Sequence, residues 1–561
     1  MSNLKSPFPT VTDSQNRLSI AFFFDGEGVV DEYYFFLLRE MGKFSRRTVF
    51  VSNGPIVESS RLKLEAMGVE IIIRENIGLY VGAYKAAIEY VGYDSLGDFE
   101  EILLFNHTFY GPIYPLSEMF SHMDKKQCGF WGITAHKAVE PNPFTGDGVM
   151  PRHLNSHFIA VRREMAASSE FRDYWEKMPK IESYYDSISK HETRFTKHFE
   201  DLGYECVVYD DDRKYSSDYP CFINIDESLE NRCPIIKRRL FFHDPVMHES
   251  HAIDLPRALR IMRETSDYDE NLIWSNIVRT ADLRTLNTTA ALTSVLPDVR
   301  MKEINRTKIK KIAVCCHVYY VDMIGELLDL CLSVPLPFDF IATTDTEAKA
   351  QIIRKACNGF PGIGNVIVRV TAQNRGRDIG ALFVACRDLF LDDRYDLVCR
   401  LHSKKSPQVD SARSNIFKRH LFENLLSSKG YVENVLDMFE EKPWVGVAVP
   451  PVVHISYPTL GMAWFSNKEP TIKEAKALGL RVKFDDHTPI SAYGSMYWFR
   501  PAAIRKLFAR GWTWEDFNPE PDLDYGDGDL PHAIERLVTY TAQDAGFLTQ
   551  QILCANQASY N

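Results

Sequence analysis

The chain alternates short apolar runs with longer amphipathic segments. In its first part the apolar runs begin at Ile20, Val49, Val69 and Ile102, and helical periodicity follows between them. Strands that alternate with helices form parallel sheets with right-handed crossovers. The pattern therefore predicts an α/β fold, whose ligands bind at the carboxyl ends of the strands.

A second set of apolar runs repeats the first in the same order. Its members begin at Ile312, Phe340, Val366 and Leu397. The frame Asn-x-Gly-x-x-x-Gly-Ala follows the third run of each set, at residues 76–83 and again at 374–381. An offset of roughly three hundred residues indicates two copies of a domain rather than a solenoid. In both copies the frame joins a strand to a helix, where free backbone N–H groups face an anion and glycines permit close approach.

Composition limits the function classes. The chain has 561 residues, enough for several domains, and a net charge of -11, which argues against a general nucleic-acid binder. Its 11 cysteines include no C-x-x-C pair, as expected for reduced thiols of a cytosolic protein. The start is polar and broken by proline, and no apolar run reaches the ~18 residues of a membrane span. We expect a protein of the cytoplasm, or one bound peripherally to the inner face of the cytoplasmic membrane.

These patterns divide the chain into an N-terminal domain at 1–212, an α-rich linker at 213–306 and a C-terminal domain at 307–561. The linker carries a basic cluster at 235–239. We interpret this cluster as a solvated helix face, with contact to an anionic membrane surface as the alternative.

Short phrases spread over nearly the whole chain resemble the rhamnan synthesis protein F family of bacterial surface-polysaccharide enzymes. They lie at residues 51–55, 109–112, 130–134, 233–237, 374–380, 401–406, 498–501 and 532–536. The resemblance implies two GT-A-like (Rossmann-like) glycosyltransferase domains joined by the linker. It also implies inverting transfer of L-rhamnose from a nucleotide sugar, dTDP-β-L-rhamnose, to a growing polysaccharide or lipid-linked glycan, such as a lipopolysaccharide O-antigen.

A nucleotide-sugar enzyme must bind a base, neutralise a diphosphate and deprotonate an acceptor hydroxyl. In the second copy the candidates for the base and ribose are His317, Thr343, Thr344 and Asp345. The candidates for the diphosphate turn are Asn374, Arg375, Arg377, Asp378, His402, Lys404 and Lys405. In the first copy the polar residues at strand ends are Asp25, Asn53, Asn76 and Asn106.

A divalent cation and a catalytic base are the two remaining groups to consider. Many GT-A enzymes hold Mg²⁺ or Mn²⁺ with an Asp-x-Asp motif, but here the position reads His402-Ser403-Lys404, which puts dependence on a divalent cation in doubt. For the base we predict Asp527, with Asp529 as second choice, and Glu192 at the matching place of the first copy.

The two copies differ in charge, because the first has Ile77, Leu79 and Tyr80 where the second has charged residues. We therefore keep two hypotheses. Both domains are active transferases, or one active C-terminal domain works beside a non-catalytic, carbohydrate-binding or scaffolding N-terminal module. A dinucleotide-binding oxidoreductase is disfavoured, because no G-x-G-x-x-G turn follows the first strand.

Overall fold

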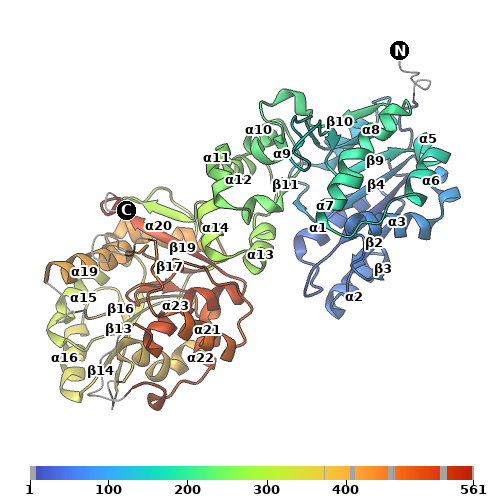
Figure 1. Ribbon diagram of the computed structural model, residues 1–561. Coiled ribbons are helices and arrows are strands. Elements are labelled where there is room, and N and C mark those ends of the chain that lie inside the picture. Colours follow the sequence, from blue (N-terminus) through green and yellow to red (C-terminus); the bar gives the residue numbers. More distant parts are fainter. Residues whose placement is uncertain are drawn as a thin grey trace. The chain divides into compact units, whose positions relative to one another are not determined.

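A computed structural model describes residues 8–371, 373, 375–404, 411–452, 459, 461–518 and 527–558. The chain forms two compact units, Met1–Asn276 and Ile277–Asn561, which are described one at a time (Figure 1).

The first unit is built on a mixed, mainly parallel sheet in the order β10-β6-β9-β4-β1-β2-β3. Its strands are β1 (Arg17–Phe23), β2 (Arg47–Asn53), β3 (Glu70–Arg74), β4 (Glu101–Asn106), β6 (Phe130–Gly132), β9 (Phe158–Arg162) and β10 (Cys206–Val208). Strand β9 is antiparallel to both β4 and β6, and the other pairs are parallel. The apolar runs that begin at Ile20, Val49, Val69 and Ile102 thus form β1 to β4, as the sequence predicts.

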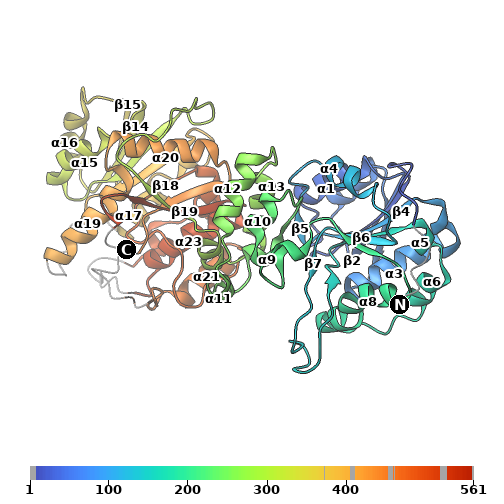
Figure 2. The same ribbon diagram turned by 90° about the horizontal axis from the view of Figure 1, so that it is seen from above.

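Helices cover both faces of this sheet. Figure 2 shows α1 and α4 on one side, and α3, α6 and α8 on the other. The helices are α1 (Glu32–Gly42), α2 (Glu58–Ala66), α3 (Leu79–Val91), α4 (Leu116–Met123), α5 (Arg163–Ala166), α6 (Ser169–Glu176), α7 (Tyr184–Ser187) and α8 (Thr193–Asp201). The core on the α3 side contains Leu18, Ile20 and Phe22, which alternate along β1 as expected for side chains on one face of a strand.

The second unit repeats this sheet and adds one strand, in the order β12-β19-β17-β18-β16-β13-β14-β15. Its strands are β12 (Thr293–Leu296), β13 (Ile312–His317), β14 (Phe338–Thr344), β15 (Ile363–Val370), β16 (Leu397–His402), β17 (Val445–Val449), β18 (Tyr497–Phe499) and β19 (Leu548–Cys554). Strand β18 takes the antiparallel place of β9. When the two sheets are aligned at the ends of β4 and β16, the pair Phe22–Asn106 of the first sheet corresponds to the pair His317–His402 of the second.

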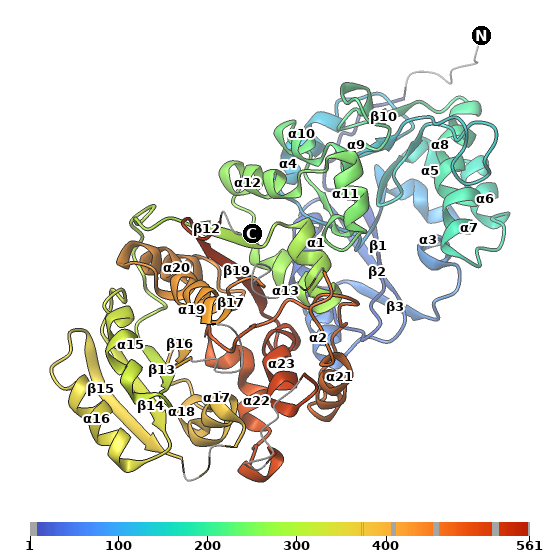
Figure 3. The same ribbon diagram turned by 60° about the vertical axis from the view of Figure 1, so that its left-hand side comes forward.

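The helices of the second unit also lie on two faces (Figure 3). Ile312, Val314 and Cys316 pack with α15, α16, α19 and α20, whereas Ala313 and Cys315 pack with α17, α18, α22 and α23. These helices are α15 (Ile324–Cys331), α16 (Glu347–Cys357), α17 (Arg377–Gly380), α18 (Arg387–Phe390), α19 (Ser411–Leu426), α20 (Lys429–Glu441), α22 (Arg505–Ala509) and α23 (Leu530–Asp544); α21 (Lys468–Ala477) packs along α23.

The segment 213–306 contributes to the sheets of both units. It contains α9 (Pro220–Ile223), α10 (Ile225–Glu230), β11 (Ile236–Lys237), α11 (Pro245–His251), α12 (Leu255–Thr265), α13 (Asn271–Thr280) and α14 (Leu283–Thr289). Strand β11 pairs with β5 (Phe109–Tyr110) of the first unit, and β12 pairs with β19 of the second. The basic cluster at 235–239 therefore includes a strand, while the domain boundaries at 212 and 307 stay a prediction.

The repeated glycine frame has the same backbone in both units. Gly78 and Leu79 have φ of 76° and 51°, and Gly376 and Arg377 have φ of 69° and 50°. Positive φ at a residue other than glycine is unusual and concentrates at functional sites. The two units therefore share this strained turn before a helix, with nearly the same backbone angles.

Among the described residues, no helix is long and apolar enough to cross a membrane.

The second glycine of the frame, Gly380, has no room for a side chain. A Cβ at Gly380 would lie 2.3 Å from the Arg375 carbonyl oxygen and 3.1 Å from the Trp514 ring. We expect Gly380→Ala to lower the free energy of unfolding by about 1–3 kcal/mol, because the turn must shift. Chemical denaturation measures this.

Gly325→Ala is the matched control, because a Cβ there meets no atom within 4 Å and alanine is the better helix former. An equal loss of unfolding free energy in both variants would contradict the prediction.

Candidate functional site

The candidate site of the second unit begins at the carboxyl ends of β13 and β14. His317 ends β13, and its Nδ1 lies 2.9 Å from the Thr343 hydroxyl on β14. Burial lowers the pKa of His317 to about 4, which leaves the imidazole neutral at physiological pH. Thr344 donates to the Val318 carbonyl at 2.8 Å, and Asp345 forms an ion pair of 2.7 Å with Lys349. The structure brings these four predicted base and ribose residues together.

Next to them, His402 ends β16, and its Nε2 lies 2.9 Å from the Gly494 carbonyl. Burial lowers the pKa of His402, and the nearby Asp378 carboxylate opposes that shift. This contact joins the end of a parallel strand to the turn that precedes β18. The imidazole is therefore fixed in orientation.

Asp378 follows the strained turn and is held by a buried arginine. The Arg400 guanidinium donates to its Oδ2 at 2.9 Å, and only 1% of the Arg400 side chain is exposed. Burial alone would raise the pKa of Asp378, but the charges of His402, Arg400, His317 and Lys404 lower it to about 2. The carboxylate is thus ionised at neutral pH, and it forms an ion pair with Arg400.

Lys404 lies two residues beyond the end of β16 and is partly buried. Its Nζ lies 4.5 Å from the centre of the Phe417 ring, a cation–π contact. Burial lowers the pKa of Lys404, while the carboxylates of Asp378 and Glu535 oppose that change. The ammonium group is therefore partly buried and lies in the field of two carboxylates.

A cavity of about 100 Å³ lies among these side chains, a volume suited to a group of phosphate size. Its lining is drawn from the glycine frame, the end of β16, the turn before β18 and the start of α23. The lining residues are Arg377, Asp378, Ile379, His402, Lys404, Gly494, Ser495, Pro531, His532 and Glu535. Cations from two segments therefore converge on one small space.

Glu535 is the acidic residue at this cavity that the sequence analysis missed. It lies on α23 and accepts hydrogen bonds from the Gly494 backbone N–H at 2.9 Å and the Ser495 hydroxyl at 3.0 Å. It also pairs with the guanidinium of Arg536. Asp527 and Asp529 do not belong to the described lining.

Glu192 has the same environment in the first unit. It ends a π-helical turn, Ile188–Glu192, and accepts from the Ser156 backbone N–H at 3.3 Å and the Ser156 hydroxyl at 2.9 Å. Strand register makes Ser156 the counterpart of Gly494, so the same backbone N–H binds a glutamate in both units. The contacts of Glu192 are therefore matched by Glu535, whereas the sequence analysis matched Glu192 with Asp527. The sequence carries no local signal for this match, because 192–195 (Glu-Thr-Arg-Phe) and 535–538 (Glu-Arg-Leu-Val) share only the glutamate.

The two predicted bases of the second unit lie in a different setting. Asp527 is exposed, and its Oδ1 accepts from the Asn467 amide at 2.8 Å. Asp529 precedes α23, and its buried Oδ2 lacks a hydrogen-bond partner among the described residues. Their catalytic role stays a prediction.

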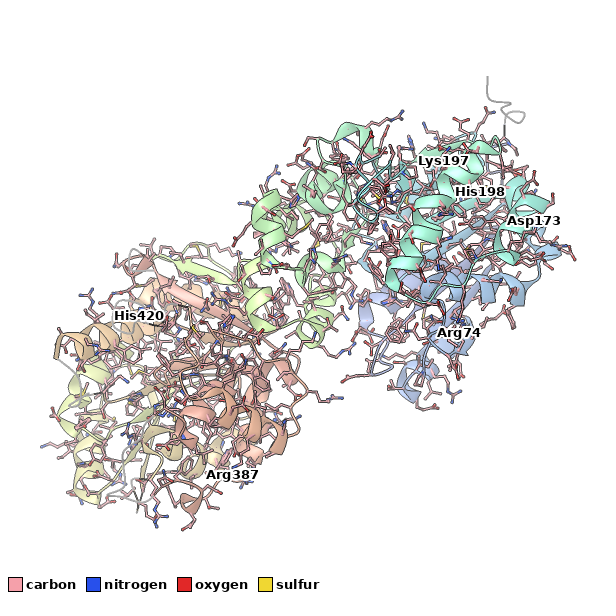
Figure 4. The ribbon with its side chains drawn as sticks, viewed as in Figure 1. Arg74, Asp173, Lys197, His198, Arg387 and His420 are labelled. Atoms are coloured by element: carbon pink, nitrogen blue, oxygen red, sulfur yellow. The ribbon has the colours of Figure 1, made fainter. Side chains whose placement is uncertain are left out.

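The polar strand ends of the first unit form a small hydrogen-bonded group. Asn53 donates to Asn76 at 3.0 Å and accepts from Arg74 at 2.7 Å. Arg74, labelled in Figure 4, is a further cation at this strand end that the sequence analysis did not single out. Asn106 accepts from the Thr108 hydroxyl at 2.6 Å, and Asp25 accepts from the backbone of its own turn, so these two residues shape loops.

Of the remaining predicted residues, Arg377 lines the cavity and Arg375 lies in the same turn, partly buried. Asn374 and Lys405 lie outside the described residues.

The described residues of the site do not suit a divalent cation. The described part of the chain contains no group of three His, Cys, Asp or Glu side chains placed to hold a metal ion. At the position of the Asp-x-Asp motif stands Lys404, whose positive charge opposes that of a metal. We therefore derive no step through a metal.

Two α/β sheets with polar clusters at the carboxyl ends of their strands define a ligand-binding α/β protein. The family model of rhamnan synthesis protein F matches residues 48–547, so the chain belongs to that family. This family membership supports a glycosyltransferase of polysaccharide synthesis.

Among curated proteins, the chain is similar to "Uncharacterized protein WxcX" of Xanthomonas campestris pv. campestris (strain B100), with 29% identity over 42% of this chain and 31% of the relative. It is also similar to "Uncharacterized protein y4gN" of Sinorhizobium fredii, with 22% identity over 35% of this chain and 50% of the relative. These matches span no more than half the length of the relatives.

Among solved structures, the apo-form glycosyltransferase GlyE of Streptococcus pneumoniae TIGR4 matches with 13% identity and a TM-score of 0.22, over 71% of this chain and 88% of its own. The WbbM bifunctional glycosyltransferase matches with 8% identity and a TM-score of 0.19, over 96% of this chain and 86% of its own. Scores this low do not establish a shared overall fold.

The Asp378–Arg400 pair predicts a pH-dependent stability. Because the folded-state pKa of Asp378 lies below its ordinary value of 3.8, its contribution is present above about pH 4 and is lost as the pH falls towards 2. We expect Asp378→Asn to destabilise the protein at pH 7 by about 3–5 kcal/mol, since Arg400 stays buried without its partner. Denaturation at pH 7 and pH 3 measures both effects.

Asp388→Asn is the matched control, because Asp388 pairs with Arg369 at the surface with 64% of its side chain exposed. Such a pair contributes about 0–1 kcal/mol. Equal losses of unfolding free energy in the two variants would show that the buried Asp378–Arg400 pair stabilises the protein no more than a surface pair does.

Proposed function

We propose that the protein is a bifunctional, inverting glycosyltransferase that moves L-rhamnose from dTDP-β-L-rhamnose to a growing surface polysaccharide, with one active site in each unit. The rhamnose donor rests on the family, since rhamnan is a polymer of rhamnose. The observation that carries the proposal is the repeated glutamate: Glu192 and Glu535 bind corresponding backbone N–H groups at the corresponding ends of the two sheets.

In the second unit, the charges suit a departing diphosphate. Negative charge develops on the leaving group as the sugar–phosphate bond breaks, and a fixed cation in a dry site stabilises it. Lys404 and Arg377 line one cavity and would supply that charge, while Asp378 and Arg400 hold the turn in place. His317, Thr343, Thr344 and Asp345 lie at the adjacent strand ends, where the base and ribose would bind.

Two carboxylates compete for the role of base in the second unit. Asp527 is the residue predicted from sequence, and Glu535 is the residue that lines the cavity. In either case the carboxylate takes the acceptor proton as the acceptor oxygen attacks the anomeric carbon from the face opposite the diphosphate. This single displacement inverts the configuration and converts a β-linked donor into an α-linkage. In the first unit Glu192 has this role.

The partners follow from this chemistry. They are a nucleotide-sugar donor and a polysaccharide or lipid-linked glycan acceptor, and a lipid-linked acceptor would bring the protein to the membrane surface. The alternative, with a non-catalytic first unit, predicts one linkage only.

The test is to incubate the full chain with dTDP-β-L-rhamnose and a synthetic rhamnosyl acceptor, and to read the product linkages by mass spectrometry and NMR. We expect Glu192→Gln to remove one linkage and Glu535→Gln or Asp527→Asn to remove another, each by at least about 100-fold in rate, the usual contribution of a general base. Glutamine keeps the shape of glutamate and one acceptor oxygen but cannot take a proton.

Glu182→Gln is the control, because Glu182 is an exposed surface residue paired with Lys180. If the wild type makes two linkages and all three site variants retain both, the base assignments are wrong. A wild type that makes one linkage favours the single-site alternative.

A further inference from the structure

Strand β11 places a lysine at the carboxyl end of β4 in the first unit. Because β11 pairs with β5, Lys237 lies opposite Phe109. Its Nζ is 3.3 Å from the Thr108 hydroxyl and 3.3 Å from the His157 ring Nδ1. A residue from the segment expected to be a linker is therefore part of the strand-end cluster.

This ammonium group lies beside the residue that corresponds to Lys404. Register equates Asn106 with His402, so Thr108, two residues further along, is the counterpart of Lys404. The first unit has threonine at that place, but Lys237 brings its Nζ beside the threonine. The turn after β4 has no lysine of its own, and Lys237 of β11 supplies a positive charge there.

The electrostatic surroundings of the two lysines overlap in part. Burial lowers the pKa of Lys237, Cys221 and then Glu192 oppose that change, and Arg239 adds a second positive charge nearby. Burial likewise lowers the pKa of Lys404, Asp378 and then Glu535 oppose it, and Arg377 adds positive charge. In each unit a lysine therefore faces the repeated glutamate, with an arginine in the vicinity.

The direct partners of Lys237 carry no compensating charge. Thr108 is neutral, and burial together with Lys237 lowers the pKa of His157 well below its ordinary value, so this imidazole is neutral too. Within the described part of the chain, no carboxylate lies within ion-pair distance of Lys237. A partly buried cation whose direct partners are neutral and which has no ion pair is unfavourable unless an anion completes the site.

We propose that Lys237, supported by Arg239, forms the diphosphate-binding subsite of the first unit, and that its ligand is the diphosphate of a nucleotide sugar. The inference rests on the proposed function and deepens it, because it names the group that would neutralise the leaving group in the unit without an equivalent of Lys404. The contrasting explanation is that Lys237 only ties β11 to the sheet.

The test uses calorimetric titration of the full chain with dTDP and, separately, UDP, since the base is not fixed by these contacts. We expect two binding equivalents in the wild type. Lys237→Met keeps the length of the side chain and removes its charge, and we expect it to weaken one equivalent about 10- to 100-fold. Lys404→Met should weaken the other equivalent to a similar extent.

Lys197→Met is the matched control in the same unit. Lys197, labelled in Figure 4, lies on α8 with 59% of its side chain exposed and pairs with Asp201. Its removal takes away the same charge but should leave both equivalents unchanged. Lys237→Arg, which keeps the charge, should retain binding better than Lys237→Met.

A second measurement does not depend on the folding of any variant. The wild type is acetylated with and without dTDP or UDP, and the rate at each lysine is read by mass spectrometry. We expect nucleotide to slow the modification of Lys237 at least about 10-fold, as ligand contact blocks the amine, and to leave Lys197 unaffected.

The outcomes separate the two proposals. Two equivalents that persist in Lys237→Met with unchanged affinity, or a Lys237 that nucleotide does not protect, would overturn the subsite while leaving a two-site transferase in place. A single equivalent that only Lys404→Met removes would overturn the subsite and favour one active unit. If the wild type binds no nucleotide, both the proposed function and the proposed subsite are contradicted.

Discussion

The hydrogen bond between a helix glutamate and the turn before the antiparallel strand determines the geometry of both units. Glu192 and Glu535 each bind the backbone N–H at the position of Ser156 and Gly494. Glu535 is buried and Glu192 is partly buried, so their lone pairs need hydrogen-bond donors, and this contact holds the helix against the turn. It also places a negative charge near Lys404 in the second unit and near Lys237 in the first.

The two units hold their strained turns by different means. In the second unit a buried ion pair joins Asp378 to Arg400. At the corresponding positions the first unit has Tyr80 and Leu104, and the Tyr80 hydroxyl lies 3.4 Å from Glu192. An apolar pair of similar volume can replace a buried ion pair with little change in stability. The backbone of the turn is therefore conserved between the copies while its electrostatics differ.

Sequence reasoning predicted what depends on local patterns. Apolar periodicity located the strands that begin near Ile20 and Ile312, and the glycine frame located the turn with positive φ, because both signals lie within a few residues. It missed Glu535, whose role depends on a turn some forty residues earlier in the chain. It also interpreted Lys237 as part of a solvated helix face, because only the pairing of β11 with β5 shows where that side chain lies. Residues that act through long-range pairing leave no periodic signal.

Strand β12 protects an edge that would otherwise be open. It hydrogen-bonds in parallel to β19, with Thr293 opposite Gln551 and Leu296 opposite Cys554. An uncovered edge strand exposes a row of backbone donors and acceptors, which invites pairing with another chain. A fragment that starts at residue 307 would lack this cover, and the free edge of β19 would favour self-association.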